Sequence, residues 1–270
     1  MSLPGRPKGE YRSAQHEGSP VSLPGRPKGE YRSAQHEGSA VNPSADNELS
    51  MARYRKHAAG YDASAQRTMN LRMRTIALLQ LKPGEVVLDV GAGTGLSYQP
   101  LLQGVGHSGR VLAFEQSPDM FAQAQARVQR AGWHNLWHCQ AAAETVQLPE
   151  AADAVLFNYV HDISRTPQAV ANILRQAKPG ARIAMAGMKF FPWWTGPLNV
   201  VAWLKNRPYN AKAADLWQPW NQVQPWCVDF KTQSTQAGMG YIAHGRLHAT
   251  RAAAAATITD DPSHLIANAA

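Results

Sequence analysis

The sequence predicts an α/β domain with a doubly wound, mostly parallel sheet. From Met51 onward, short apolar runs of strand length alternate with segments whose apolar residues recur at helical spacing. Parallel strands need long crossovers, and a helix is the usual crossover, so this alternation favours a parallel sheet. The first apolar run ends in a glycine-rich turn, and an aromatic-rich insertion separates the fifth strand from the sixth.

Each element of this sheet has a local signal. Apolar runs predict strands over seven segments: 86–90, 110–114, 136–141, 154–159, 182–187, 228–232 and 240–247. Helical spacing of apolar residues predicts helices over four segments: 63–81, 98–102, 118–131 and 166–177. The Lys-Pro-Gly sequence at 82–84 ends the first helix, and Pro167 fits the first turn of the last one.

The domain is expected to span residues 51–250, between two segments that lack a core. Residues 2–21 and 22–41 repeat one 20-residue sequence, apart from Pro20, which becomes Ala40. Each copy has almost no apolar residues, so it cannot bury enough surface to offset the entropy of ordering. We therefore expect a disordered arm over residues 1–50 and a frayed Ala-rich tail over residues 251–270.

Composition argues against several classes of protein. The apolar stretches fall short of the ~18 residues that a membrane-spanning helix needs, and the N-terminus lacks the apolar core of a signal peptide. Cys139 and Cys227 have neither CxxC spacing nor the spacing of Cys/His metal ligands. No disulfide framework and no metal site are therefore expected. A cytoplasmic location is the resulting expectation.

The chain is basic, because 27 Lys and Arg against 19 Asp and Glu give a net charge of +8. Positive charge favours anionic partners such as nucleic acid, a membrane surface or an acidic small molecule, but many basic enzymes bind no polyanion. The repeated arm carries only +1 in each copy, which is dilute for a phosphate-binding tail. The sequence thus predicts no specific nucleic-acid partner, leaves peripheral membrane contact open and gives no oligomeric state.

The strongest functional signal is the run LDVGAGTG at 88–95, where the first strand ends. Open α/β sheets bind ligands at the carboxyl ends of their strands. Glycines let the backbone turn sharply and approach a ligand closely, and the carboxylate of the Asp can accept from a ligand ammonium group. We therefore expect five residues of this run in a cofactor site: Asp89, Gly91, Ala92, Gly93 and Gly95.

A second acid, Glu115, follows the second strand, 26 residues after Asp89. A carboxylate in that position can accept hydrogen bonds from both hydroxyls of a ribose, which indicates a nucleoside cofactor. The NAD-binding fingerprint GxGxxG has glycine at its sixth position, but the sixth residue counted from Gly91 is Leu96. The loop is therefore unfavourable for NAD, although an NAD-dependent oxidoreductase stays as an alternative.

Four motifs in succession resemble those of the class I S-adenosylmethionine-dependent methyltransferases. They are LDVGAGTG at 88–95, AFEQSPDM at 113–120, the AE and LP pairs at 143–144 and 148–149, and ILRQAKPGARI at 173–183. The resemblance covers about residues 59–183 and implies a Rossmann-like fold with S-adenosylmethionine as cofactor. It further implies three contacts: Asp89, Gly91 and Gly93 with the amino-acid part, Glu115 with the ribose and Gln116 beside the adenine.

The chain departs from this family on the adenine side. Relatives often read Gly-Asp-Ala-Glu before the LP pair, with the Asp near the adenine amino group, whereas this chain reads Ala141-Ala142-Ala143-Glu144. Backbone groups of Ala142 and Ala143 are expected to replace that contact.

The resemblance places the end of the fourth strand, Asn158-Tyr159-Val160-His161-Asp162, beside the reacting methyl group. Asn158 is expected to join the cofactor site. The segment is not the Asn-Pro-Pro-Tyr loop of enzymes that methylate exocyclic amines of bases or glutamine amides. His161 can act as a general base on an acceptor hydroxyl. Alternatively it only packs over the cofactor, since transfer from a sulfonium can proceed by alignment alone.

The insertion between the fifth and sixth strands holds six of the eight tryptophans. Its large aromatic residues are Phe190, Phe191, Trp193, Trp194, Trp203, Trp217, Trp220 and Trp226. Trp favours boundaries between water and apolar groups, so we expect this segment to cover a small apolar or aromatic acceptor. A packed core and a membrane-docking surface are alternatives. The predicted reaction is methyl transfer to O, N or C of that acceptor, with methylation of a lipid at a membrane surface as a further alternative.

Overall fold

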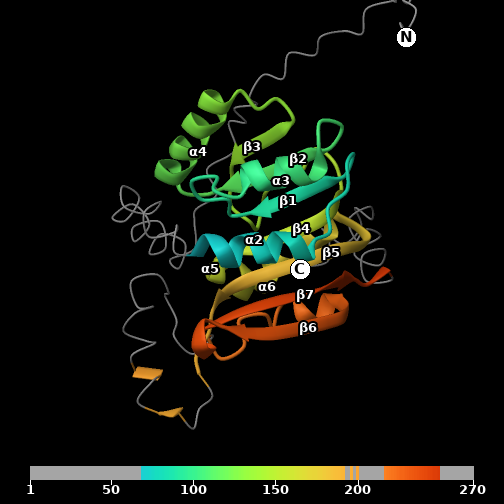
Figure 1. Cartoon of the computed structure of the whole chain (residues 1–270). Helices are drawn as coiled ribbons and strands as arrows, with labels where there is room; N and C mark the ends of the chain where they lie inside the picture. The colour runs from blue at the N-terminus through green and yellow to red at the C-terminus, as the bar shows by residue number, and fades with distance from the viewer. Residues whose placement is uncertain (1–67, 192–194, 197–198, 201–215, 250–270) are drawn as a thin grey trace, which may run out of the picture. The chain divides into compact units, whose positions relative to one another are not determined.

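The computed structural model describes residues 68–191, 195–196, 199–200 and 216–249. Its strands form one seven-stranded sheet in the order β3-β2-β1-β4-β5-β7-β6, which runs from top to bottom in Figure 1. The strands are β1 (Val86–Val90), β2 (Arg110–Glu115), β3 (Leu136–Gln140), β4 (Ala152–Asn158), β5 (Ala177–Met188), β6 (Cys227–Thr235) and β7 (Gly240–Leu247). The expected Rossmann-like, doubly wound and mostly parallel sheet is confirmed.

The sheet reverses its winding next to β1. Strands β3, β2, β1, β4 and β5 pair in parallel, whereas β7 is antiparallel to β5 and β6 is antiparallel to β7. The chain first winds outward from β1 to β3 and then returns to the other side of β1 with β4. The ends of β1 and β4 therefore form the switch point at which open α/β sheets bind ligands.

Helices lie before β1 and between most of the successive parallel strands. They are α2 (Met69–Leu78), α3 (Tyr98–Val105), α4 (Pro118–Ala131), α5 (His161–Arg165) and α6 (Pro167–Arg175), with two short 3-10 turns, η4 (Gln224–Trp226) and η5 (Gln236–Gly238). The bounds of α4 follow from its sequence. The Ser117 hydroxyl accepts from the Met120 N–H before the first turn, and Gly132 ends the helix with a left-handed φ of 65°.

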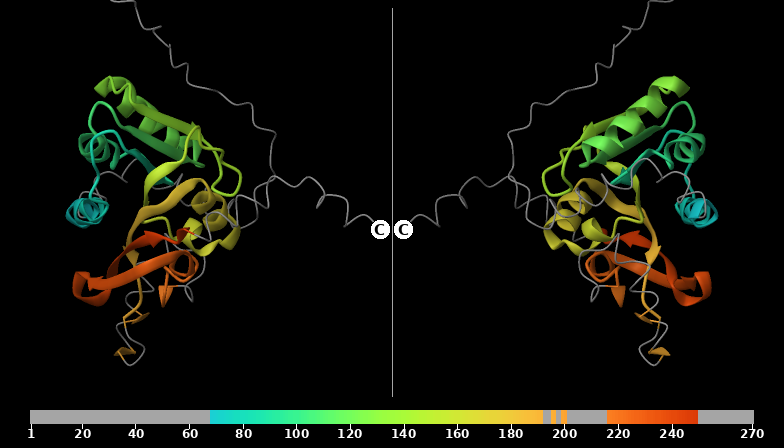
Figure 2. Two further views of the ribbon diagram at one scale, coloured as in Figure 1. Left: turned by 90° about the vertical axis from the view of Figure 1, so that its right-hand side faces the viewer. Right: turned by 90° about the vertical axis from the view of Figure 1, so that its left-hand side faces the viewer.

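Helices cover both faces of the sheet (Figure 2). Alternate residues of β1 belong to the cores on opposite faces. Val87 packs with apolar residues of α2, α3 and α4, while Val86 and Leu88 pack with residues of α6. All five residues of β1 are buried as a result. This explains why the strand, apart from Asp89, reads as an apolar run rather than as an alternating one.

The structure corrects some bounds. The helix expected over 166–177 ends at Arg175, because Ala177 already pairs with Ala152 and begins β5. The five-residue helix α5 was not expected, since it is too short for a periodic pattern. Several expectations lie outside the described residues. They concern residues 63–67 of the first expected helix, the arm over 1–50, the tail over 251–270, and Trp193, Trp194 and Trp203.

Candidate functional site

Three neighbouring strands end side by side with polar or glycine residues. β1 leads into Gly91, β2 ends at Glu115 and β4 ends at Asn158. Because β1 pairs in parallel with both β2 and β4, these ends meet at one edge of the sheet. A pocket of about 680 Å³, open to solvent, lies at this edge.

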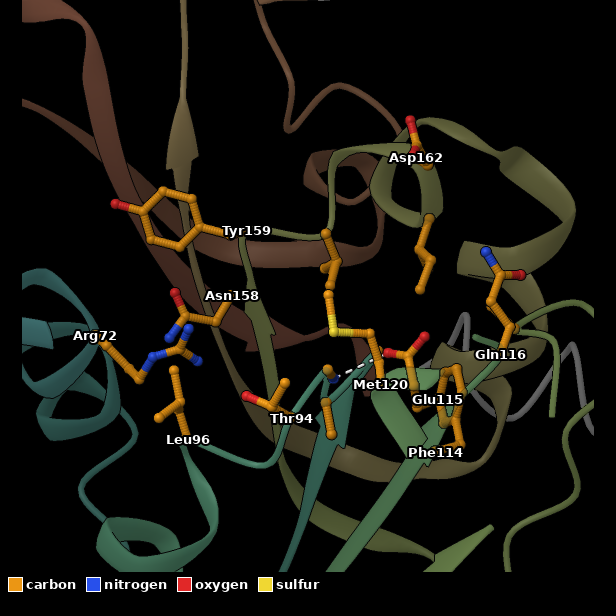
Figure 3. Close-up of a pocket in the computed structure, with 16 residues that line it drawn as sticks. Arg72, Thr94, Leu96, Phe114, Glu115, Gln116, Met120, Asn158, Tyr159 and Asp162 are labelled. Carbon is orange, nitrogen blue, oxygen red and sulfur yellow. Dashed lines mark hydrogen bonds between the residues drawn. The ribbon is translucent and has the colours of Figure 1, made fainter. Parts of the chain in front are cut away.

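The three strand ends, α2, α4 and α5 all contribute to the wall of this pocket (Figure 3). Its lining residues are Arg72, Gly91, Ala92, Gly93, Thr94, Leu96, Phe114, Glu115, Gln116, Met120, Ala143, Asn158, Tyr159, Val160, Asp162 and Ile163. Most residues expected in the cofactor site are among them. The exceptions are Asp89, Gly95 and Ala142, which do not line the pocket.

The glycines between β1 and α3 all have left-handed backbone conformations, with φ of 56° at Gly91, 59° at Gly93 and 78° at Gly95. A Cβ on Gly91 would lie 2.8 Å from side-chain carbons of both Val160 and Ile163, and a Cβ on Gly95 would lie 2.6 Å from the Tyr98 ring. A Cβ on Gly93 would meet no atom within 4 Å. Gly91 and Gly95 thus permit close packing within the protein, whereas Gly93 leaves the pocket open.

Glu115 connects the end of β2 to this glycine loop. Its Oε2 accepts from the Gly93 N–H at 2.9 Å (dashed line in Figure 3), and its Oε1 accepts from the Ser117 N–H at 2.8 Å. Burial raises the pKa of the carboxyl, while these backbone hydrogen bonds oppose the rise. Each carboxylate oxygen can accept a further hydrogen bond, so the group can still bind a ligand in the pocket.

A buried polar chain links α2 to β1. Arg72 lines the pocket, and its guanidinium donates to the Ser97 hydroxyl at 2.7 Å. Asp89 is 1% exposed, and burial raises its pKa to about 7 against the opposing effects of Arg72 and Ser97. The Asp89 Oδ2 has no hydrogen-bond partner within the described residues. Arg72 and Ser97 thus favour the ionised form of Asp89, and Arg72 in turn lines the pocket.

Sequence reasoning missed Arg72. The residue lies in α2 on the same face as Ile76, four positions later, and both are buried. A cation on the apolar face of an amphipathic helix is the signal that could have identified it, because such a charge needs a partner or a ligand.

Two residues at the end of β4 face the pocket with unusual features. Asn158 is 5% exposed, yet neither its Oδ1 nor its Nδ2 has a hydrogen-bond partner within the described residues. Tyr159 has a φ of 61°, which is strained for a bulky residue, and its N–H donates to the Ala186 carbonyl at 2.8 Å. Figure 3 shows Arg72, Asn158 and Tyr159 on one side of the pocket and Glu115 and Gln116 on the other.

His161, the candidate general base, does not line the pocket. Its Nε2 accepts from the Met188 N–H at 3.0 Å, and its Nδ1 has no hydrogen-bond partner in the described part of the chain. Burial lowers its pKa to about 4, and Arg165 contributes in the same direction. The imidazole is therefore neutral at physiological pH and joins α5 to β5.

Gln116, Met120 and Ala143 form the remaining wall, beside Glu115. The Ala143 carbonyl accepts from the Asn172 amide at 2.9 Å. The Ala142 carbonyl accepts from the Val146 N–H, also at 2.9 Å. Both carbonyls thus already have partners within the fold, and Ala143 contributes to the pocket as a small apolar group.

Within the described ranges, no group of three or more His, Cys, Asp or Glu side chains could hold a metal ion. None of the helices in that part of the chain is long and apolar enough to cross a membrane.

Comparisons with known proteins agree with this geometry. The family model for a methyltransferase domain matches residues 87–180, which include the glycine loop, Glu115 and Asn158. A malonyl-[acyl-carrier protein] O-methyltransferase from Serratia marcescens is 29% identical over 194 residues, covering 71% of each chain. A protein-L-isoaspartate O-methyltransferase from Aeropyrum pernix is 27% identical over 135 residues, which are 50% of this chain and 48% of that protein.

The fold also matches solved structures. An O-methyltransferase family protein from Burkholderia thailandensis superposes with a TM-score of 0.59 at 14% identity, covering 76% of this chain and 63% of that one.

The chain spans about half the length of most of the curated relatives it matches. The matched family nevertheless decides between the two cofactors that the glycine loop and Glu115 suggest, in favour of S-adenosylmethionine over NAD. The chain therefore contains a methyltransferase domain, and its motifs and sheet are similar to those of the class I S-adenosylmethionine-dependent methyltransferases.

Proposed function

We propose that this protein transfers the methyl group of S-adenosylmethionine to a small acceptor, and that the pocket at the ends of β1, β2 and β4 binds the cofactor. The observation that carries the proposal is the distribution of polar groups across that pocket. Glu115 lies on one side, while Arg72 and Asn158 lie on the other (Figure 3). S-adenosylmethionine has a ribose diol on one side of its sulfonium and a zwitterionic amino acid on the other, so its polar groups match this distribution.

The side of the pocket at the end of β2 suits the adenosine half of S-adenosylmethionine. Glu115 can accept from both ribose hydroxyls with the lone pairs that Gly93 and Ser117 leave open. Met120 and Ala143 supply apolar surface for the adenine ring, and Gln116 borders it. Contacts of the Ala142 and Ala143 backbones with the adenine stay predictions.

The side of the pocket at the end of β4 suits the amino-acid half of S-adenosylmethionine. The Arg72 guanidinium can pair with the carboxylate, and the Asn158 amide can donate to that carboxylate or accept from the ammonium group. Burying an amide without partners costs free energy, so the unpartnered atoms of Asn158 fit a residue whose partner is a ligand. Gly91, Ala92 and Gly93 also line the pocket, and they follow β1, which lies between β2 and β4.

The chemical step needs little from the protein beyond alignment. When bound, the cofactor supplies a methyl group that its sulfonium already activates. An electron pair of the acceptor O, N or C would bond to the methyl carbon while the electron pair of the C–S bond would return to sulfur, and the proton of the acceptor would go to water. Tyr159, Val160 and Ile163 line the pocket at the β4–α5 connection, where they can shape the approach of the acceptor.

We propose that His161 packs between α5 and β5 and takes no proton. Its Nε2 is already occupied by the Met188 N–H, and a pKa of about 4 makes it a weak base near neutrality. The variant His161→Gln keeps an acceptor for that N–H. We expect this variant to retain the pH profile of transfer, whereas the loss of one ionisation from the profile would restore the general-base role.

For the acceptor we propose a second hollow, of about 520 Å³, next to the cofactor pocket. It is lined by Ser164, Arg165, Trp217, Gln218, Pro219, Asn221 and Gln222. The hollow adjoins the pocket at α5, because Asp162 lines the pocket and forms an ion pair at 2.7 Å with Arg165, which lines the hollow. An acceptor held in the hollow would have to extend past this helix to the pocket wall at Tyr159 and Val160 to meet the methyl group. An exposed Trp beside three side-chain amides suits a small planar molecule with polar substituents.

Transfer of a tritiated methyl group to a panel of phenols and aromatic amines tests this acceptor class. For an acceptor found in this way, Trp217→Ala should raise KM about tenfold without weakening cofactor binding, since stacking positions only the acceptor. Met73→Ala is the matched control, because Met73 and Trp217 are both 44% exposed. An unchanged KM in Trp217→Ala would remove the hollow from the reaction, and transfer only to lipid vesicles would favour the membrane alternative.

A further inference from the structure

A side chain outside the pocket holds part of the glycine loop. The Arg127 Nε donates to the Thr94 carbonyl at 2.9 Å. Arg127 lies near the end of α4, whereas Met120, near the start of the same helix, lines the pocket. One helix therefore contacts both the proposed adenine wall and the far side of the loop.

The loop needs such support because of its composition. Three glycines in left-handed conformations lose more conformational entropy on ordering than other residues would. The first half of the loop is tied to β2, through the Ala92 N–H to the Phe114 carbonyl at 2.9 Å and the Gly93 N–H to Glu115. Arg127 ties the second half to α4. A hydrogen bond from a cation is about twice as strong as a neutral one, which suits this task.

Arg127 does not line the pocket, so it can affect a ligand only through the loop. The loop contacts the two halves of the cofactor unequally in the proposed arrangement. Glu115, Gln116 and Met120 hold the adenosine half from β2 and α4. Gly91, Ala92 and Gly93 follow β1, which lies between β2 and β4 and hence between Glu115 and Asn158. A loop that loses its tie at Thr94 should therefore disturb the amino-acid half more than the adenosine half.

We propose that Arg127 is a positioning residue that fixes the glycine loop through the Thr94 carbonyl and thereby sets affinity for the amino-acid half of the cofactor. The inference rests on the proposed cofactor binding. It adds a residue outside the pocket, and it specifies which half of the ligand responds.

Two ligands and three variants test it. S-adenosylhomocysteine contains both halves, whereas 5′-deoxy-5′-methylthioadenosine contains the adenosine half without the amino acid. Arg127→Leu should weaken S-adenosylhomocysteine binding about tenfold in calorimetric titration and change methylthioadenosine binding less than about twofold, since one charge-assisted hydrogen bond is lost. Arg127→Lys, which keeps a charged donor, should recover part of the loss.

Arg130→Leu is the matched control. Arg130 lies three residues later in α4, is exposed, and donates to the Ala126 carbonyl of its own helix, so its replacement removes the same charge without touching the loop. We expect it to leave both affinities unchanged. If Arg127→Leu does not fold, Arg127→Lys is compared with Arg130→Lys instead. Arg127→Lys should then bind S-adenosylhomocysteine severalfold more weakly, with its affinity for methylthioadenosine unchanged, and Arg130→Lys should keep both affinities.

Equal weakening of both ligands, or no weakening of either, would overturn the positioning role while leaving the proposed function intact. Failure of the unaltered protein to bind S-adenosylhomocysteine would overturn both proposals together.

Discussion

Gly91 and Gly93 have nearly the same backbone conformation but different surroundings. Both occupy the left-handed region, with φ of 56° and 59°. Behind Gly91 lie Val160 and Ile163, whereas the space beside Gly93 is the pocket itself. The first glycine therefore serves packing between β1 and the β4–α5 connection, and the second leaves room for a ligand.

Substitution by Ala should separate these two roles. Both changes cost roughly 1–2 kcal/mol for the left-handed conformation, and Gly91→Ala adds about 1–3 kcal/mol for overlap with Val160 and Ile163. Thermal melting should thus show the larger loss in Gly91→Ala. Calorimetry should show that Gly93→Ala, although better folded, binds S-adenosylhomocysteine at least about tenfold more weakly. Undiminished binding in Gly93→Ala would show that the ligand does not approach this residue.

Asp89 should make cofactor binding depend on pH. Its pKa is raised to about 7 by burial, and Arg72, which lines the pocket, stabilises its ionised form. We expect the ionised form in turn to keep the Arg72 guanidinium in place for the ligand. Affinity for S-adenosylhomocysteine should therefore increase severalfold from pH 6 to pH 8, as Asp89 ionises. In Asp89→Asn this dependence should disappear.

The same group should affect the stability of the ligand-free protein in the opposite direction. Because the folded pKa lies above the unfolded value of 3.8, ionisation of Asp89 destabilises the fold increasingly as pH rises from about 4 to 7. The melting temperature of the ligand-free protein should be measured over this pH range and compared with that of Asp89→Asn. The same pH dependence in both proteins would contradict the raised pKa.

At the scale of elements, ion pairs join strands at the edge of the sheet opposite the pocket. Glu85 precedes β1 and accepts from both terminal nitrogens of Arg182 in β5. Asp153 in β4 accepts from the Val86 N–H at 2.9 Å and pairs with Lys178 in β5 at 2.8 Å. These contacts tie the amino ends of β1, β4 and β5 together, so the carboxyl ends that form the pocket keep their register.

Removing Arg182 should destabilise the fold. Glu85 and Arg182 are 18% and 17% exposed, so Arg182→Met leaves a half-buried carboxylate unpaired and should cost about 1–3 kcal/mol in thermal or urea unfolding. Arg110→Met is a suitable control, because Arg110 and Glu150 are 37% and 36% exposed and their pair should contribute about 1 kcal/mol or less. Equal losses in the two variants would contradict this ranking.

Acid should act on the same contacts. Burial opposes ionisation of Glu85 and of Asp153, but their hydrogen bonds and cationic neighbours outweigh it, and both pKa values are lowered. Their stabilisation is therefore complete above the ordinary carboxyl pKa values and is lost as pH falls below about 4 through the lowered ones. Arg182→Met should lose less stability than the unaltered protein over that range.

The sequence allowed good prediction of strands and long helices and poor prediction of short elements. Strands β1 and β2 are buried on both faces, so their apolar runs are continuous and easily recognised. The helix α4 has a cap, a Pro in its first turn and a Gly at its end, and its predicted bounds match the observed ones. α5 has five residues and no periodic signal, so only tertiary packing defines it.

At the scale of the whole molecule, the site depends on strand order more than on any motif. The order β2-β1-β4 brings Glu115, the glycine loop and Asn158 to one pocket, although the last two are far apart in sequence. Local motifs predicted the β1 and β2 parts of this pocket. They could not predict Arg72, which reaches the pocket from α2, nor the burial of His161 against β5, because both depend on long-range packing.

Calorimetric titration of the protein with S-adenosylhomocysteine and, separately, with NADH tests the central claim most directly. We expect binding of the first and none of the second. Glu115→Ala should weaken binding by ~2–4 kcal/mol, because it removes charge-assisted hydrogen bonds in a buried site. Glu115→Gln should weaken the binding of S-adenosylhomocysteine nearly as much, since its amide NH₂ would face a backbone N–H of Gly93 or Ser117.

Glu150→Ala, which removes a surface carboxylate, controls for charge and should bind S-adenosylhomocysteine like the unaltered protein. Binding of NADH in place of S-adenosylhomocysteine, or full affinity in a folded Glu115→Ala, would contradict the cofactor site described above.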